Sequence, residues 1–438
     1  MKTPICDFIE NYKNSDTVRA HMPGHKGRGL LGFEGLDITE IPGADSLYEA
    51  NGIIYESEQN ASGLFGVHTF YSTEGSSLCI RAMLHLCTIA KEKPLIFAAR
   101  NAHRSFLSAA ALLGADVKWL FPADGETYIS CNITPEALEK ELSEAEQKPA
   151  AVFVTSPDYL GNMLDIKGLS EVCRRAGVLL CVDNAHGAYL KFLPSAMHPM
   201  ELGADMCCDS AHKTLPVLTG GAYLHVASDE LAQYAKASMA LFGSTSPSYL
   251  ILASLDAANK YLAGGYAERL EKFSASVHEL KTKLSDFGYA ICGTEPLKIT
   301  VDAYGYGYSG EEIAGLLAKQ GIMVEYADTR FVVLMLTEQL EKADLLRIEN
   351  AFLSIEKRAE ISAEIPRVIK PKALMSPSEV INKPYEQISV CEACGRIAAI
   401  GVVTCPPAVD IVVGGELIDQ EVISVLNYYG KEKINVIK

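Results

Sequence analysis

The sequence predicts an α/β protein with a large domain on a mostly parallel sheet, followed by a smaller C-terminal α/β domain. Between about residues 69 and 226, short apolar segments alternate with helical stretches, the pattern of a parallel sheet covered by helices. The chain has 438 residues, too many for one ordinary core. Hydrophobic residues make up 48% and charged residues 21%, which excludes a largely disordered chain.

The first part of the chain is rich in glycine. At its centre lies His21–Gly27, in which the Pro23-Gly24 step breaks both helix and strand. We therefore expect residues 1–60 to form an irregular N-terminal arm.

Seven apolar, β-rich segments are predicted as strands, and helices are expected between most of them. The helix at Pro135 has Thr134 as a good cap and proline at its first position. Ligands of such sheets bind in the loops beyond the C-terminal strand ends. We predict a large domain over residues 61–287. Its strands are Thr69–Ser72, Leu95–Ala98, Val117–Phe121, Ala151–Thr155, Val178–Asp183, Met206–Asp209 and Ala222–Val226.

The rest of the chain continues the α/β pattern. Two long helices are predicted over about 248–263 and 265–287, and residues 290–360 show a strand–helix–strand–strand–helix order. The charged, proline-containing residues 361–375 are expected to connect this region to a mixed segment over 376–438. We assign residues 288–438 to a C-terminal small domain or domains.

Charge and cysteine content limit the partners. Thirty-nine Lys and Arg against 55 Asp and Glu give a net charge of −16, so no dense cationic face for nucleic acid is expected. The N-terminus lacks an apolar signal core and no apolar run could span a bilayer, so we expect a cytoplasmic protein with reduced thiols and no membrane partner. Cys391 and Cys394 lack a second Cys or His pair, which favours incidental thiols and no metal site.

The most informative segment is Asp209–Leu215, with Lys213 just after a predicted strand. A lysine at a strand end of an open α/β sheet can form a Schiff base with a carbonyl cofactor. A surface lysine is the alternative if this residue is considered alone. Thirty residues earlier, Asp183 ends another predicted strand, a spacing that allows one crossover. Pyridoxal phosphate needs such a pair, a lysine for its aldehyde and a carboxylate at its ring nitrogen.

Other residues near predicted strand ends complete this set. The small Ala185 could lie under the ring, although Asp183 alone could be a helix cap. Gly75, Ser76 and Ser77 begin a helix whose first N–H groups could bind a phosphate, or they are a plain cap. His103 follows the strand Leu95–Ala98 and could stack on a flat ring or transfer a proton; a hydrogen-bonded loop histidine is the alternative.

With these residues in place, the chain resembles the Orn/Lys/Arg decarboxylase family of bacterial fold-type-I pyridoxal-phosphate enzymes, over nearly its whole length. It resembles the shorter members without the large N-terminal wing domain. The Ser210–Leu215 stretch is the most specific match. The other matching segments are His21–Gly27, Asp37–Gly43, Gly75–Ser77, Asn101–Ser105, Thr155–Pro157, Asp183–Gly187, Ser244–Tyr249, Cys405–Pro407 and Gly415–Glu416.

The resemblance implies a role for each matching residue. Lys213 would join the cofactor, Asp183 would face the ring nitrogen and His103 would stack on the ring, and these three form the expected catalytic set. Glu416 would steer a basic substrate tail. Thr245 and Ser246, with Ser244, would reach the cofactor phosphate of a neighbouring subunit, which implies a homodimer with shared sites. The remaining cofactor-binding residues would be Gly75, Ser76, Ser77, Ala185, His186, Ser210 and His212.

The chain departs from the family pattern mainly on the substrate side. Asn184 replaces a glutamate, Ala102 and Arg104 flank His103, Glu74 precedes Gly75 where Asn-Gly is typical, and Cys405–Asp410 replaces Tyr-Pro-Pro-Gly-Ile-Pro. These departures leave the choice of amino acid open.

The resemblance implies decarboxylation of lysine, ornithine or arginine to the corresponding amine. A second hypothesis is another pyridoxal-phosphate reaction, such as transamination with Arg330, Arg367 or Arg396 binding the α-carboxylate, or a lyase step. A third is a non-catalytic cofactor-binding homologue. The survival of Lys213, Asp183 and His103 together ranks it last.

Overall fold

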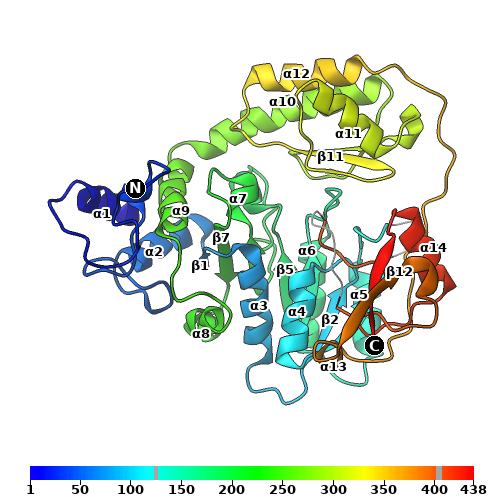
Figure 1. Cartoon of the computed structure of the whole chain (residues 1–438), viewed down its shortest axis with the longest axis horizontal. Coiled ribbons are helices and arrows are strands. Elements are labelled where there is room, and N and C mark those ends of the chain that lie inside the picture. Colours follow the sequence, from blue (N-terminus) through cyan, green and yellow to red (C-terminus); the bar gives the residue numbers. More distant parts are fainter. Residues whose placement is uncertain (123–126, 401–406) are drawn as a thin grey trace. The chain divides into compact units, whose positions relative to one another are not determined.

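The computed structural model describes residues 1–122, 127–400 and 407–438 (Figure 1). The chain divides into two compact units. The first unit combines Met1–Ile89 with Leu179–Leu270, and the second combines Ala90–Val178 with Glu271–Lys438. Each unit is therefore assembled from separated stretches of sequence. The domain boundaries at residues 60 and 287 stay a prediction.

The first unit contains four strands in the order β1-β7-β6-β5. Strands β5 and β6 are parallel, whereas β7 is antiparallel to both β6 and β1. Every residue of β6 and β7 is buried, because both faces of these strands are covered. The strands are β1 (His68–Ser72), β5 (Leu179–Asp183), β6 (Met206–Asp209) and β7 (Ala222–Val226). The helices are α1 (Pro4–Lys13), α2 (Ile53–Phe65), α3 (Gly75–Thr88), α7 (Ala211–Thr214), α8 (Asp229–Ala240) and α9 (Tyr249–Ala263), and α10 (Tyr266–Asp286) includes the boundary between the units.

The N-terminal segment is more ordered than predicted. The expectation of an irregular arm over residues 1–60 is wrong for Pro4–Lys13, which forms α1, and for the first turns of α2, which begins at Ile53. Pro4 occupies the first turn, where its missing N–H costs nothing, and Ile5 and Ile9 are buried. The Asp256 carboxylate of α9 accepts the N–H groups of Ile5 and Cys6, both at 3.0 Å. This long-range cap explains why the local sequence did not indicate the helix.

The second unit contains three parallel strands in the order β4-β2-β3. Its first helices follow the predicted pattern, and the Ala137 N–H donates to Thr134 Oγ1 at 3.2 Å, which confirms the predicted cap. All seven strands expected between residues 69 and 226 are present, with ends that shift by one residue at most. The elements are β2 (Leu95–Ala99), α4 (Arg104–Leu113), β3 (Asp116–Leu120), α5 (Pro135–Ser143), β4 (Ala151–Thr155) and α6 (Ile166–Ala176).

A separate antiparallel sheet follows α10, with strands in the order β10-β11-β9-β8 and α11 packed against β11 (Figure 1). The predicted order for residues 290–360 is wrong at its start, because two strands rather than one precede the first helix. The glycine-containing turn at Gly293, with φ of +78°, separates them. The elements are β8 (Ala290–Cys292), β9 (Lys298–Asp302), α11 (Gly310–Lys319), β10 (Tyr326–Ala327), β11 (Phe331–Met335) and α12 (Lys342–Leu353).

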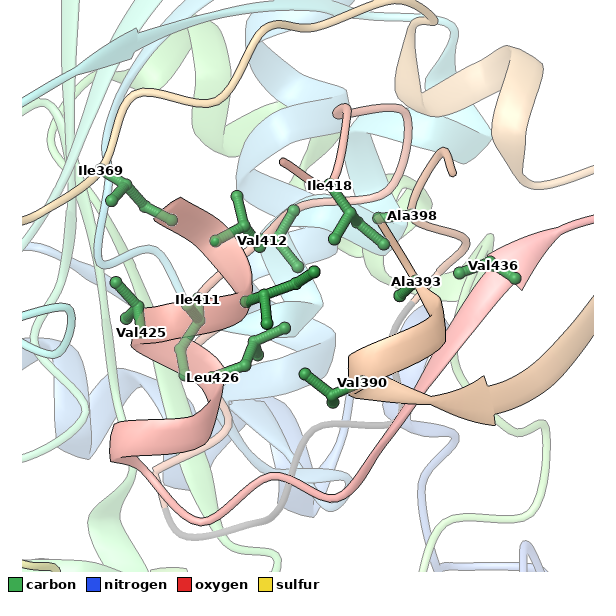
Figure 2. Close-up of a cluster of buried hydrophobic side chains, with 12 residues drawn as sticks. Ile369, Val390, Ala393, Ala398, Ile411, Val412, Ile418, Val425, Leu426 and Val436 are labelled. Carbon is green, nitrogen blue, oxygen red and sulfur yellow. The ribbon is translucent and has the colours of Figure 1, made fainter. Parts of the chain in front are cut away.

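The C-terminal part of the second unit has its own apolar core. Strands β12 (Tyr385–Ser389) and β13 (Lys433–Ile437) pair antiparallel, and α13 (Pro377–Val380) and α14 (Gln420–Tyr428) complete the region. Figure 2 shows the buried side chains of this core gathered beside α14, β12 and β13. The described part of residues 361–375 has no regular helix or strand, as expected for a connecting segment.

Candidate active site

Lys213 lies in α7, directly after β6, and contacts one of the predicted site residues. Its Nζ atom lies 2.9 Å from Nε2 of His186, in the turn after β5. His186 is buried and Lys213 is half-buried. Because β5 and β6 are parallel neighbours, their C-terminal ends lie at one edge of the sheet, which brings these two turns together. The imidazole of His186 can therefore accept a proton from the Lys213 ammonium group.

Asp183 is the last residue of β5 and is buried, with 3% of its surface exposed. Its Oδ1 atom accepts the Ala185 N–H at 3.2 Å and faces the Cys208 thiol at 3.6 Å. Burial raises the pKa of the Asp183 carboxyl, and the nearby Lys213 charge opposes this shift. A cationic group placed at this carboxylate would be strongly favoured, because a buried charge gains most from a close partner.

The predicted phosphate-binding residues also meet. Ser210 Oγ donates to Ser76 Oγ at 2.8 Å, which joins the end of β6 to the start of α3. Gly75 has φ of +69°, and a Cβ added there would lie 4.0 Å from His212 Cε1. The His212 ring nitrogen Nδ1 lies 2.9 Å from the Gly221 carbonyl, and burial lowers the pKa of this histidine.

The start of α3 is not capped by its own N-terminal side chain. The N-terminal residue Glu74 makes no side-chain cap to this 14-residue helix. The hydroxyl groups of Ser76 and Ser210 meet at this helix N-terminus, where a phosphate could be held.

A buried carboxylate, Asp209, fixes the end of β6. Its Oδ2 atom lies 3.0 Å from His198 Nε2 and 3.1 Å from His225 Nε2, while Asn184 Nδ2 donates to its Oδ1 at 2.7 Å. Burial alone would raise the pKa of Asp209, but the two histidines hold it well below its usual value. Asp209 thus connects the turn of Asp183 and His186 to the strand that precedes Lys213.

His198, Asp209, His225 and Cys207 are all buried, and their ligand-type atoms lie within 4.8 Å of one another. Such a set could hold a metal ion. The hydrogen bonds just described already satisfy the carboxylate, so we assign the cluster to positioning. Cys391 and Cys394 are exposed and are not members of it.

The other predicted residues are placed elsewhere in the chain. His103 belongs to the second unit, where it caps α4 and its Nδ1 accepts the Ser105 N–H at 3.2 Å. Thr245 and Ser246 are exposed, between α8 and α9. The neighbouring Ser244 N–H donates to Glu74 Oε1 at 2.6 Å, so this segment is tied to the start of α3.

Glu416 does not have the free carboxylate that substrate binding would need. Both of its oxygens accept from the Arg100 guanidinium, at 2.7 and 2.8 Å, and the Val413 N–H donates to Oε2 at 2.7 Å. Glu416 and Arg100 are 3% and 4% exposed. This bidentate pair corrects the expected substrate role, because breaking it would leave a buried, unpaired guanidinium.

Sequence reasoning missed Asp209, its two histidines and the Arg100–Glu416 pair. Asp209 directly precedes Ser210 and lies four residues before Lys213, and this position could have indicated a role for Asp209 in the site. Arg100 and Glu416 are 316 residues apart, and no local pattern joins them.

Comparison with known proteins identifies the family. Residues 3–287 match the Orn/Lys/Arg decarboxylase major domain and residues 359–433 match the C-terminal domain of the same family. An uncharacterised Bacillus subtilis protein, YaaO, is 28% identical, with 98% of this chain and 94% of YaaO aligned. An arginine decarboxylase of Bacillus anthracis is 29% identical, with 96% and 91% aligned.

The fold agrees with a solved structure. Lysine decarboxylase A from Pseudomonas aeruginosa superposes with a TM-score of 0.81 over 99% of this chain and 80% of that chain, at 17% sequence identity. The predicted α/β fold class is thereby confirmed. Together with the two family matches, these findings show that the chain belongs to the Orn/Lys/Arg decarboxylase family of amino-acid carboxy-lyases.

Proposed function

We propose that this protein uses pyridoxal phosphate to decarboxylate a basic amino acid, namely lysine, ornithine or arginine. The observation that supports this most is the hydrogen bond between Lys213 and His186 near the buried Asp183, in a chain of this decarboxylase family. When bound, pyridoxal phosphate supplies an electron-accepting ring that stabilises the electron pair left when the α-carboxylate departs.

The chain's own residues fit this group. Lys213 would hold its aldehyde carbon, and the buried Asp183 carboxylate would pair with its ring nitrogen and keep that nitrogen protonated. The start of α3 at Gly75, Ser76 and Ser77 would hold its phosphate together with Ser210 and His212. The small Ala185 would leave room for its ring.

Proton handling would fall to three side chains. His186 Nε2 can accept a proton from Lys213 Nζ, which yields the neutral amine that a nucleophile requires. Lys213 or His103 would return a proton to the substrate α-carbon. In His103, Nδ1 accepts a backbone N–H, which places the ring proton of the neutral imidazole on Nε2.

Two of the three candidate arginines are engaged by acids, which disfavours transamination through them; the third, Arg367, is exposed and stays a candidate for that alternative. Arg330 donates from Nε and Nη2 to Asp302 Oδ2 at 2.9 and 2.6 Å, and Arg396 pairs with Glu386 at 2.9 Å. Both are engaged by acids, whereas an aminotransferase needs an arginine for the substrate α-carboxylate.

The proposal includes a homodimer in the cytoplasm, with Thr245 and Ser246 completing the phosphate site of the partner. The exposure of both residues supports this. In the described chain, none of the helices is both long and apolar enough to cross a bilayer. Replacing Thr245 and Ser246 with alanine should weaken cofactor binding and leave the secondary structure intact; unchanged cofactor affinity would remove them from the site.

A product assay tests the proposed reaction. The protein, loaded with pyridoxal phosphate, is incubated separately with lysine, ornithine and arginine, and mass spectrometry detects the amine that lacks the carboxyl group. We expect one clear amine product. Stable 2-oxo acid would favour transamination instead, and bound cofactor with no product from any of the three would contradict the proposal.

A further inference from the structure

A pocket of about 100 Å³ lies in the C-terminal part of the second unit. One wall is formed by Val409–Val412, and α14 contributes Leu426. Lys431 and Lys433 also line the pocket. Asp410 is shared with a smaller adjoining pocket that Arg100 lines. The cavity is large enough for a small organic molecule or several waters.

Asp410 contrasts with its neighbour Glu416. The Glu416 carboxylate is saturated by Arg100 and Val413, whereas Asp410 makes no hydrogen bond or ion pair with any residue that the structure describes. Burial raises the pKa of Asp410 to about 7; the charges of Arg100 and Arg104 oppose this shift, and Glu416 adds to it. Asp410 is half-buried in the pocket wall, and a carboxylate there without a donor is less stable than one that is paired.

The rest of the pocket suggests what would satisfy this carboxylate. Ile411, Val412 and Leu426 line the same pocket, and Figure 2 shows all three in the apolar core, Leu426 on α14 and the other two beside that helix. An ammonium group on a short hydrocarbon chain would supply the missing donors to Asp410 and cover this apolar surface. The two lysines add cationic groups that a ligand carboxylate could contact.

We propose that this pocket binds the ammonium group of a small organic amine, with Asp410 as its ion-pair partner. The ligand is a basic amino acid or the amine formed from it, a choice of amines that rests on the proposed function. Both kinds of ligand carry the ammonium group, and only the amino acid has a carboxylate that Lys431 and Lys433 could contact.

The segment that contains Val409 also pairs with the start of α4. The Ala408 carbonyl accepts the Arg104 N–H at 2.9 Å, and Val409 forms an isolated β-bridge with His103.

Calorimetric titration of the full-length protein tests this site. Cofactor-loaded protein is first reduced with borohydride, so that no substrate is turned over. It is then titrated at pH 8 with lysine, ornithine, arginine and their three decarboxylated amines. We expect saturable binding of at least one ligand and a loss of about tenfold or more in affinity for Asp410→Asn. Asp410→Glu, which keeps the charge, should retain part of the affinity.

Matched variants make the result specific. Glu432→Gln removes an exposed carboxylate of the same region and should leave the affinity unchanged. Lys431→Gln should weaken an amino acid but not an amine, which distinguishes the two sources. Absence of binding by all six ligands, or equal affinity in Asp410→Asn and the unchanged protein, would overturn the proposal.

Ligand binding at Asp410 and the proposed decarboxylation can fail independently. Asp410-dependent binding in a protein that forms no amine would contradict the decarboxylase function and leave the pocket assignment standing. Amine formation with unchanged ligand affinity in Asp410→Asn would do the reverse.

Discussion

Two carboxylates, the buried Asp209 in the first unit and the half-buried Asp410 in the second, have opposite surroundings. Asp209 faces His198, His225 and Asn184, and its pKa is held below its usual value. Asp410 has no such partner among the described residues, and burial raises its pKa to about 7. Both carboxylates lose contact with water, Asp209 fully and Asp410 in part, and the hydrogen-bond donors around each then decide whether its charge is stable. A saturated acid suits a positioning role, and an unsatisfied acid in a pocket suits a ligand.

The largest effect is expected at the residue that Asp209 helps to position. Lys213→Ala should lower the decarboxylation rate about a thousandfold or more, because it removes both the attachment point of the cofactor and a proton carrier. The visible absorption of cofactor joined to the protein should disappear as well. A variant that still holds borohydride-fixed cofactor would contradict this assignment.

Asp183→Ala provides a comparison within the same site. It should leave the cofactor able to bind but lower turnover by about a hundredfold or more, since the ring nitrogen loses the partner that keeps it protonated. Steady-state kinetics with saturating cofactor checks this. Near-normal turnover would remove Asp183 from its proposed role.

Asp209→Asn should lower the free energy of unfolding by about 3 kcal/mol at pH 7, because two buried histidines lose their charged partner. The folded pKa of Asp209 lies below its unfolded value. Its stabilisation is therefore present at neutral pH and is lost as the pH falls below about 4. Urea unfolding measures the difference. The control Asp229→Asn removes an acid from an exposed pair with His68 and should cost less than about 1 kcal/mol.

Asp410→Asn should have the opposite effect and raise the free energy of unfolding. The folded pKa of about 7 lies above the ordinary 3.8, so the cost of the buried charge appears as the pH rises from about 4 through 7. The variant should therefore be more stable than the unchanged protein by about 2 kcal/mol at pH 8.5, with a smaller gain at pH 5. Urea unfolding at both pH values checks this; an equal effect at the two values would show that Asp410 does not titrate differently on folding.

The smallest effect on stability is expected at Ala408, two residues before Asp410. Ala408 has φ of +56°, a left-handed conformation that costs a residue with a Cβ about 1 kcal/mol, and it stands where the family usually has glycine. Ala408→Gly should raise the free energy of unfolding by at most about 1 kcal/mol, because glycine also gains freedom in the unfolded chain. A clear loss of stability would show that the methyl group is needed for packing.

The same comparison shows what sequence could predict. The strands ending at Asp183 and Asp209 were predictable from apolar runs, and the chemistry followed because parallel neighbours end at one edge of the sheet. The contact of Ser76 with Ser210 was implied by the family resemblance. Helix α1 was missed, because its cap comes from Asp256, about 250 residues away.

The residues of the C-terminal pocket could not be found in this way. The carboxylate of Glu416 is saturated and that of Asp410 is not, and the placement of Arg100 and of the Val413 N–H separates the two cases. Sequence spacing gives no measure of such enclosure. The Cys405–Asp410 departure from the family was visible, and its last two residues, Val409 and Asp410, line the pocket. Cys405 and Pro406 lie outside the described residues.

Release of labelled carbon dioxide tests the central claim most directly. Lysine, ornithine and arginine, each labelled with carbon-13 at the α-carboxyl carbon, are supplied to the cofactor-loaded protein and to Lys213→Ala. We predict labelled carbon dioxide from at least one substrate, in step with its amine, and none above background from the variant. Label retained in a 2-oxo acid, or in the unchanged amino acid while the cofactor is bound, would contradict the account.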